Sequence, residues 1–135
     1  MKKSEIKNSA DLFFYKGQVD FNVAVLLLES FSAGECEIDL DTIMFHFQQC
    51  AEKMLKSILS KNKIRIKQTH SIESLMDLLV ENAIDSPSDF EPLKSLSEYA
   101  VDGRYAVIHD DIDDAEQYIG LLKELSEFVQ VAISE

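Results

Sequence analysis

Apolar residues recur three or four positions apart through most of the chain, which is the spacing of amphipathic helices. The clearest helix is predicted from residue 41 to about residue 61. Its apolar face consists of Ile43, Met44, Phe47, Ala51, Met54, Leu55, Ile58 and Leu59. The polar side chains that lie mostly off this face are Gln48, Gln49, Glu52, Lys53 and Lys56. The alternating "KIRIK" that follows would be a single strand without a partner, so the pattern predicts an all-α fold.

A long first helix is predicted from about residue 4 to residue 31. Its apolar positions become denser toward the C-terminal half, which indicates burial on more than one side. Gly17 lowers the helix propensity locally and would allow a neighbouring helix to pack closely. The loop that follows contains Asp39 and Asp41, either of which can cap the next helix.

Further helices are predicted in the second half of the chain. One begins near residue 71 and fades before Pro87. Ser88, with a glutamate three residues later, has a capping-box spacing and opens a short helix to about residue 101. Asp113 has the same spacing and would cap a last helix. Four or five helices with short connections predict an up-and-down helical bundle, and the length suits a single domain over residues 1–135.

The formal net charge is −12, from 13 basic and 25 acidic residues. Such a charge repels nucleic acid at a distance, because phosphate binding depends on lysine and arginine. Six basic residues nevertheless fall within 15 positions: Lys53, Lys56, Lys61, Lys63, Arg65 and Lys67. A narrow basic site is therefore compatible with the sequence. The polar N-terminus and the absence of a long apolar run predict a cytoplasmic protein without a membrane span.

Familiar cofactor and metal motifs are absent from the sequence. It contains no P-loop, dinucleotide fingerprint, HExxH or GxSxG motif, so we predict no cofactor. The acidic run from His109 to Glu116 could hold a cation, but it lacks the glycine and the spacing of a calcium loop. We therefore predict solvated acids there and no metal site. Two cysteines make no disulfide framework, and we expect Cys36 at the surface and Cys50 half-buried, both as free thiols.

The three histidines differ in their surroundings. His46 is expected to be partly exposed or at an interface, and His70 to make a capping or connecting hydrogen bond. His109 is preceded by Arg104 at a distance of five residues, and Tyr105 adjoins the arginine. Histidine transfers protons near neutral pH, and arginine binds phosphate through two hydrogen bonds. Metal-free cleavage of RNA through the ribose 2′-hydroxyl needs those two roles, while a loop between two helices is the alternative interpretation.

The stretch from Phe45 to Leu79 resembles the HEPN family (higher-eukaryote and prokaryote nucleotide-binding domain). The second helix of that family typically reads FHxQQAAEKxLKxLL and is followed, after a variable linker, by TH-[DS]-[LI]-x-x-L. The matching residues are Phe45, His46, Gln48, Gln49, Ala51, Glu52, Lys53, Leu55, Lys56, Leu59, Thr69, His70 and Leu75. "YAVDGRYAVIH" is similar to the closing element of the family, so the resemblance extends from about Ser4 to Val131.

The resemblance implies a helical bundle that usually dimerises and carries an Arg-x(4–6)-His motif near the start of its last long helix. In ribonuclease members two such motifs meet across the dimer cleft, and Arg104 and His109 fit this spacing. Another branch carries RYP at this place and an acidic tail, and "DGRYA" followed by "DDIDD" resembles that branch as well. Many bacterial members are encoded beside a minimal nucleotidyltransferase and resemble toxin–antitoxin partners.

Three functions follow from these observations. The first is a dimeric nucleotide-binding or nucleotidyltransferase-associated module of a toxin–antitoxin-like system, whose candidate ligand-binding residues are Gln48, Gln49, Glu52, Lys53, Lys56 and His70. The second is a metal-independent endoribonuclease, in which Arg104 holds the scissile phosphate, His109 is the general acid or base, and Tyr105 positions a base or phosphate. The third is a structural helical dimer without a ligand. The homodimer is predicted because the first and last helices have broader apolar faces than one small bundle needs.

Overall fold

The computed structural model describes residues 1–35, 37–66, 68–85, 88–100 and 112–135. Within these ranges all regular elements are helical, which confirms the predicted all-α class. The elements are η1 (Lys3–Glu5), α1 (Ser9–Ser32), α2 (Leu40–Lys61), α3 (Ile72–Glu81), η2 (Ser88–Tyr99) and α4 (Ile112–Ser134). Among these described elements, none crosses a membrane: no helix is long and apolar enough.

Capping side chains set the starts of the first three α-helices. The side chain of Asn8 caps α1, that of Asp39 caps α2 and that of Ser71 caps α3, each by accepting from the amide three residues on at 2.8, 2.8 and 3.2 Å. Asp39 and not Asp41 is therefore the cap of α2, and hydrogen bonds from the side chain and the amide of Thr42 hold the pKa of Asp39 below its ordinary value.

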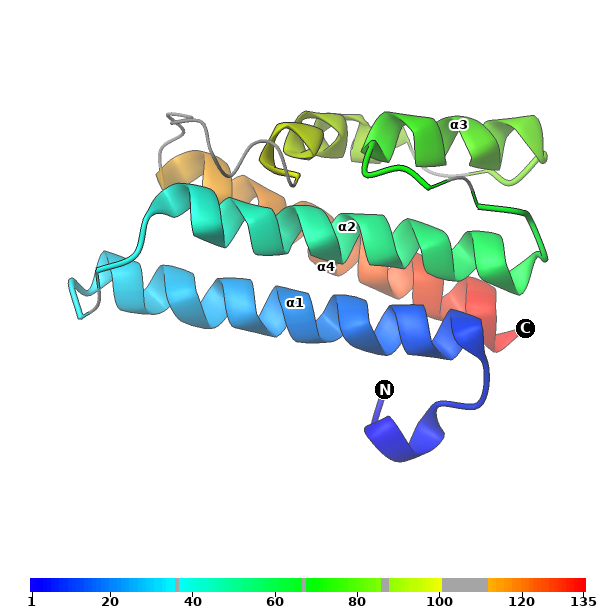
Figure 1. Ribbon diagram of the computed structural model, residues 1–135, viewed down its shortest axis with the longest axis horizontal. Coiled ribbons are helices and arrows are strands. Elements are labelled where there is room, and N and C mark those ends of the chain that lie inside the picture. The colour runs from blue at the N-terminus through cyan, green and yellow to red at the C-terminus, as the bar shows by residue number, and fades with distance from the viewer. Residues whose placement is uncertain (36, 67, 86–87, 101–111) are drawn as a thin grey trace.

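The helix α2 lies at the centre of the bundle (Figure 1). It runs antiparallel to α1, with α4 behind this pair and α3 and η2 along the opposite side of α2. Twelve of its 22 residues are buried, compared with five of 24 in α1. Because α1, α3, η2 and α4 all pack against α2, side chains from these neighbouring elements can reach the side chains of α2.

The close approach of α1 and α2 occurs at Gly17, as its sequence context predicts. A Cβ atom at this position would lie 3.0 Å from Met54 Cε and 3.4 Å from the carbonyl oxygen of Cys50. The prediction of a half-buried Cys50 is wrong, because α1 lies so close that the thiol is fully buried. This burial raises the pKa of the Cys50 thiol far above its ordinary value. Cys36 lies outside the described residues.

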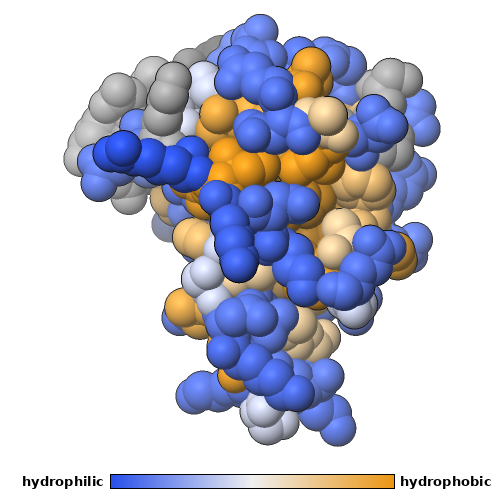
Figure 2. All heavy atoms as spheres, turned by 90° about the vertical axis from the view of Figure 1, so that its right-hand side faces the viewer, coloured by the Kyte–Doolittle hydropathy of each residue, from blue (hydrophilic) through white to orange (hydrophobic). Residues whose placement is uncertain are grey.

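The C-terminal part follows the predicted order with two local differences. The segment from Ser88 forms a 3₁₀-helix and not an α-helix, and it contains Pro92. Asp113 lies inside α4, whose described part starts at Ile112, so it is not the residue before the helix. Figure 2 looks onto the end of the bundle where α2 and α3 finish, and it shows apolar surface there bordered by polar side chains.

Candidate functional site

The Arg104–Tyr105–His109 stretch lies in the segment 101–111, outside the described residues. The predicted catalytic roles of these three residues therefore stay predictions from the sequence. The other predicted set lies on α2 and in the connection to α3.

Glu52 is the centre of the first polar cluster, which we name the Glu52 cluster (Glu52, Gln48, Lys56 and His70). Glu52 as a whole residue is only 4% exposed. Oε1 accepts from Gln48 Nε2 at 3.1 Å and lies 3.0 Å from His70 Nδ1, while Oε2 accepts from Lys56 Nζ at 3.1 Å. Gln48 Nε2 also donates to the backbone carbonyl of His70 at 3.1 Å. The cluster thus fastens the segment before α3 to the middle of α2.

All four residues of the Glu52 cluster belong to the six predicted ligand-binding residues. Gln49 joins them as a fifth, because its Nε2 donates to Gln48 Oε1 at 2.7 Å. The expectation that Gln48 and Glu52 lie off the buried stripe is wrong, because the segment around His70 covers them. His70 makes the connecting hydrogen bond that its position predicts. A fully buried Gln48 and a nearly buried Glu52 are satisfied internally, which is how buried polar groups avoid a large desolvation penalty.

Asp20 is the centre of a second cluster, the Asp20 cluster (Asp20, His46 and Lys53). It projects from α1, and its carboxylate binds His46 Nδ1 at 3.1 Å through Oδ1 and Lys53 Nζ through Oδ2. Burial alone would raise the pKa of Asp20, but the hydrogen bonds and charges of His46 and Lys53 together outweigh it and hold the pKa below its ordinary value. His46 is partly exposed, as expected, with 26% of its side chain accessible.

Sequence reasoning missed Asp20 as a member of the site. The available signal was its context, because it is the only acidic residue between Leu12 and Leu28. A lone carboxylate in such an apolar stretch needs a partner when the helix packs.

The two clusters share one arrangement. In each, a carboxylate holds the Nδ1 of a histidine and the ammonium of a lysine. When the imidazole is neutral and donates through Nδ1, its Nε2 is an unprotonated acceptor. Between the carboxylates, one solvent-facing strip of α2 carries partly exposed polar side chains at helical spacing: His46, Gln49, Lys53 and Lys56. We name these four residues the α2 polar strip.

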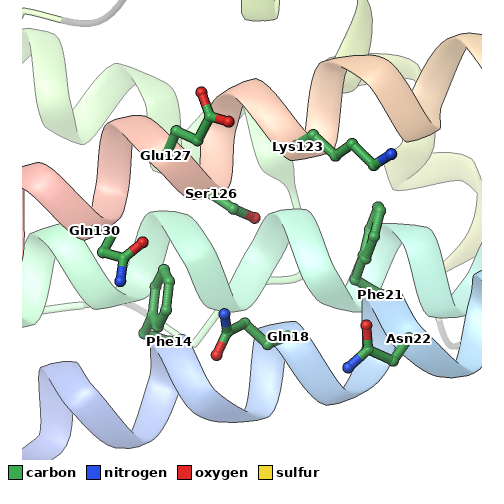
Figure 3. A pocket seen from close by; sticks show the side chains of 8 residues that line it. All are labelled: Phe14, Gln18, Phe21, Asn22, Lys123, Ser126, Glu127 and Gln130. Atoms are coloured by element: carbon green, nitrogen blue, oxygen red, sulfur yellow. The ribbon is translucent and has the colours of Figure 1, made fainter. Parts of the chain in front are cut away.

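A separate groove of about 300 Å³ runs between α1 and α4 (Figure 3). Figure 3 shows Phe14, Gln18 and Phe21 rising from α1 toward α4, with Ser126 and Gln130 opposite. Of the predicted site residues that the structure describes, none lines it. In the described ranges no group of three His, Cys, Asp or Glu side chains could hold a metal ion.

Comparison with known proteins shows to which family the chain belongs. The model of the HEPN domain matches residues 12–132. The chain belongs to the HEPN family. A solved structure described as "ST0689, an archaeal HEPN homologue" matches this HEPN chain with 23% identity and a TM-score of 0.65, over 95% of this chain and 99% of that one. At this identity the likeness shows the fold alone. The comparison with curated proteins gave no match.

Proposed function

We propose that this HEPN protein is a dimeric nucleotide-binding module that holds its ligand on the α2 polar strip. The supporting observation is that the Asp20 and Glu52 clusters hold two ammonium groups and two imidazoles along one face of α2. The strip is a local exception in a chain of net charge −12. Lys53 and Lys56 supply the donors to a phosphate chain here, while the carboxylates of Asp20 and Glu52 balance their charges.

The roles of the strip residues follow from their chemistry. Each ammonium has three donors and is held by one carboxylate, so Lys53 and Lys56 can still donate to phosphate oxygens. Gln49 supplies an amide beside them, and amides can pair with the edge of a nucleobase. The carboxylates of Asp20 and Glu52 hold the lysines in place before the ligand arrives, which lowers the entropy cost of binding.

Titration calorimetry at low ionic strength with ATP and related nucleotides tests this proposal. We expect the native chain to bind the nucleotide. Combining Lys53→Ala with Lys56→Ala removes both ammonium donors to the phosphates, and a loss of ~1.4 kcal/mol of binding free energy would weaken binding ~10-fold. Lys94→Ala is the matched control, since Lys94 is a lysine of η2 paired with Glu91 outside the strip. If no nucleotide binds, the remaining interpretation is a structural helical dimer without a ligand. If the double variant binds as tightly as the native chain, the nucleotide does not bind on the α2 polar strip.

The alternative function is a metal-independent endoribonuclease. The observation that favours it is the Arg104-x4-His109 spacing in a HEPN chain. Arg104 would hold the scissile phosphate, His109 would transfer the proton, and Tyr105 would position a base or phosphate. Purified protein is incubated with cellular RNA beside Arg104→Ala and His109→Ala. Cleavage that persists equally in both variants would rule out this role.

The proposed partner is a nucleotidyltransferase in a toxin–antitoxin-like pair. This proposal is supported by the HEPN family membership. We expect a nucleotidyltransferase gene beside the gene of this chain and co-elution of the two proteins after co-expression. Two proteins that elute separately would contradict the pairing.

A further inference from the structure

A row of exposed aliphatic side chains runs along α1. Leu12, Val19 and Leu26 are 45%, 40% and 66% exposed and are spaced seven residues apart. Seven residues make nearly two helical turns, so the three side chains share one face at intervals of roughly 10 Å. We name them the α1 row. The other large hydrophobic residues with comparable exposure in the described part of the chain, Val80 and Val131, are on different helices.

The α1 row lies in a nearly uncharged stretch. From residue 12 to residue 28 the sequence has two charged residues, Lys16 and Asp20, although 28% of the chain is charged. Asp20 is bound to His46 and Lys53 of α2, so Lys16 is the one charge between residues 12 and 28 that is not tied to α2, and the next charge along α1 is the exposed Glu29. Two copies with a net charge of −12 repel each other over most of their surfaces. The row is where such copies can meet, because cores of interfaces are depleted in charged residues.

We propose that a second copy of this chain covers the α1 row, with the two α1 helices antiparallel and the two-fold axis at Val19. The row is symmetric about that residue, so Leu12 of one copy faces Leu26 of the other. Tyr15 and Val23, four residues on either side of Val19, exchange in the same way. A two-fold interface requires this kind of self-complementary surface.

The charge beside the row selects the antiparallel direction. In a parallel pair Lys16 of one copy would face Lys16 of the other, and like charges across an interface are unfavourable. In the antiparallel pair Lys16 faces Asn22, a polar residue that also lines the groove between α1 and α4. This inference rests on the proposed dimer and names its surface.

Light scattering after size exclusion at micromolar concentration tests the interface. We expect the native chain to have twice its mass of 15.3 kDa. Val19→Glu places two carboxylates against each other at the axis, so we expect at least ~100-fold weaker association and a monomer. Leu26→Glu, at the most exposed position of the row, should act in the same direction. Val80→Glu is the matched control, because it makes the same change at a 73% exposed valine of α3 and should leave the dimer intact.

The possible results distinguish an error about the α1 interface from an error about dimerisation itself. A native monomer would overturn both, whereas a dimer that persists in Val19→Glu would overturn only the surface named here. Helix content by circular dichroism confirms that each variant is folded. The relative direction of the two α1 helices is tested by disulfide formation under oxidation in a Cys36→Ser background. In the antiparallel pair Leu12 of one copy faces Leu26 of the other, so a mixture of Leu12→Cys and Leu26→Cys chains should cross-link faster than Leu26→Cys chains alone. The reverse order would overturn the antiparallel arrangement.

Discussion

The helices α1 and α2 lie side by side but use their residues in opposite ways. From Leu12 to Leu28 α1 is almost free of charge, yet α1 buries five of 24 residues and exposes three large aliphatic side chains. The helix α2 carries more polar residues, yet it buries twelve of 22, among them Gln48, Glu52 and Ser57.

This difference shows that position in the bundle, and not the apolar content of a helix, decides burial. Because α2 has neighbours on several sides, its polar residues must find partners within the chain. Because α1 lies at the edge, one apolar face of it stays uncovered in the single chain. Four predictions can break or sharpen this contrast.

The largest effect is expected for Phe47→Ala in α2. Phe47 is fully buried and its ring contacts that of Phe21, so its loss should reduce the free energy of unfolding by about 3–5 kcal/mol. Leu26→Ala in α1 should cost about 0.5 kcal/mol or less in dilute solution. Urea denaturation at two protein concentrations measures both. The Leu26 effect should grow with concentration and the Phe47 effect should not, and equal concentration dependence would contradict the contrast.

Glu52→Ala should destabilise the fold by about 3 kcal/mol, because it leaves Lys56 and Gln48 without their buried partner. Glu52→Gln retains a hydrogen-bonding oxygen and should cost less. The control is Glu73→Ala, which removes an exposed carboxylate of α3. If Glu52→Ala denatures in urea at the native midpoint, the Glu52 cluster does not hold α3 to α2.

Gly17→Leu should cost about 2 kcal/mol, since its side chain would displace Met54 and press on the backbone of α2. Gly17→Ala should be close to neutral, because a gain of about 1 kcal/mol in helix propensity offsets the shift of the Met54 methyl group. For Gly120→Ala in α4, the described part of the chain has no atom within 4 Å of the added carbon apart from the adjacent residues and backbone of α4 itself, so the change should stabilise the helix. Thermal melting of the three variants measures these effects. If Gly17→Leu had the same melting temperature as Gly120→Ala, the close approach of α1 and α2 at Gly17 would be refuted.

Asp20→Asn should destabilise the fold by about 1 kcal/mol at pH 7, less than Phe47→Ala, Glu52→Ala or Gly17→Leu, through lost charged hydrogen bonds to His46 and Lys53. Because the folded state lowers the pKa of Asp20, its contribution is present above the unfolded pKa of about 4 and is lost as the pH falls through the folded pKa. The gap in stability between the native chain and Asp20→Asn should therefore shrink in acid. Asp77→Asn, on the exposed face of α3, is the control, and a gap that widens below pH 4 would contradict the lowered pKa.

Much of the fold could be predicted from the sequence, because helix periodicity and capping are local. The all-α class, the order of the helices and the cap at Asp39 or Asp41 needed only neighbouring residues, and Gly17 marked the close approach correctly. Two local details were wrong, the helix type from Ser88 and the cap at Asp113, and the errors about burial concern tertiary cover. Cys50 is fully buried because α1 lies against it, and Gln48 and Glu52 are buried because the segment at His70 folds over them.

The site divides along the same line. The sequence by itself determined the HEPN family, the Arg104-x4-His109 spacing and the polar residues of α2, since each depends on residue identity and spacing. Only the tertiary structure decided that Asp20 joins His46 and Lys53, that Glu52 joins His70 and Lys56, and that the α1 row stays uncovered. The physical reason is that helical periodicity tells which side chains share a face, whereas burial and pairing depend on which distant segment packs against that face.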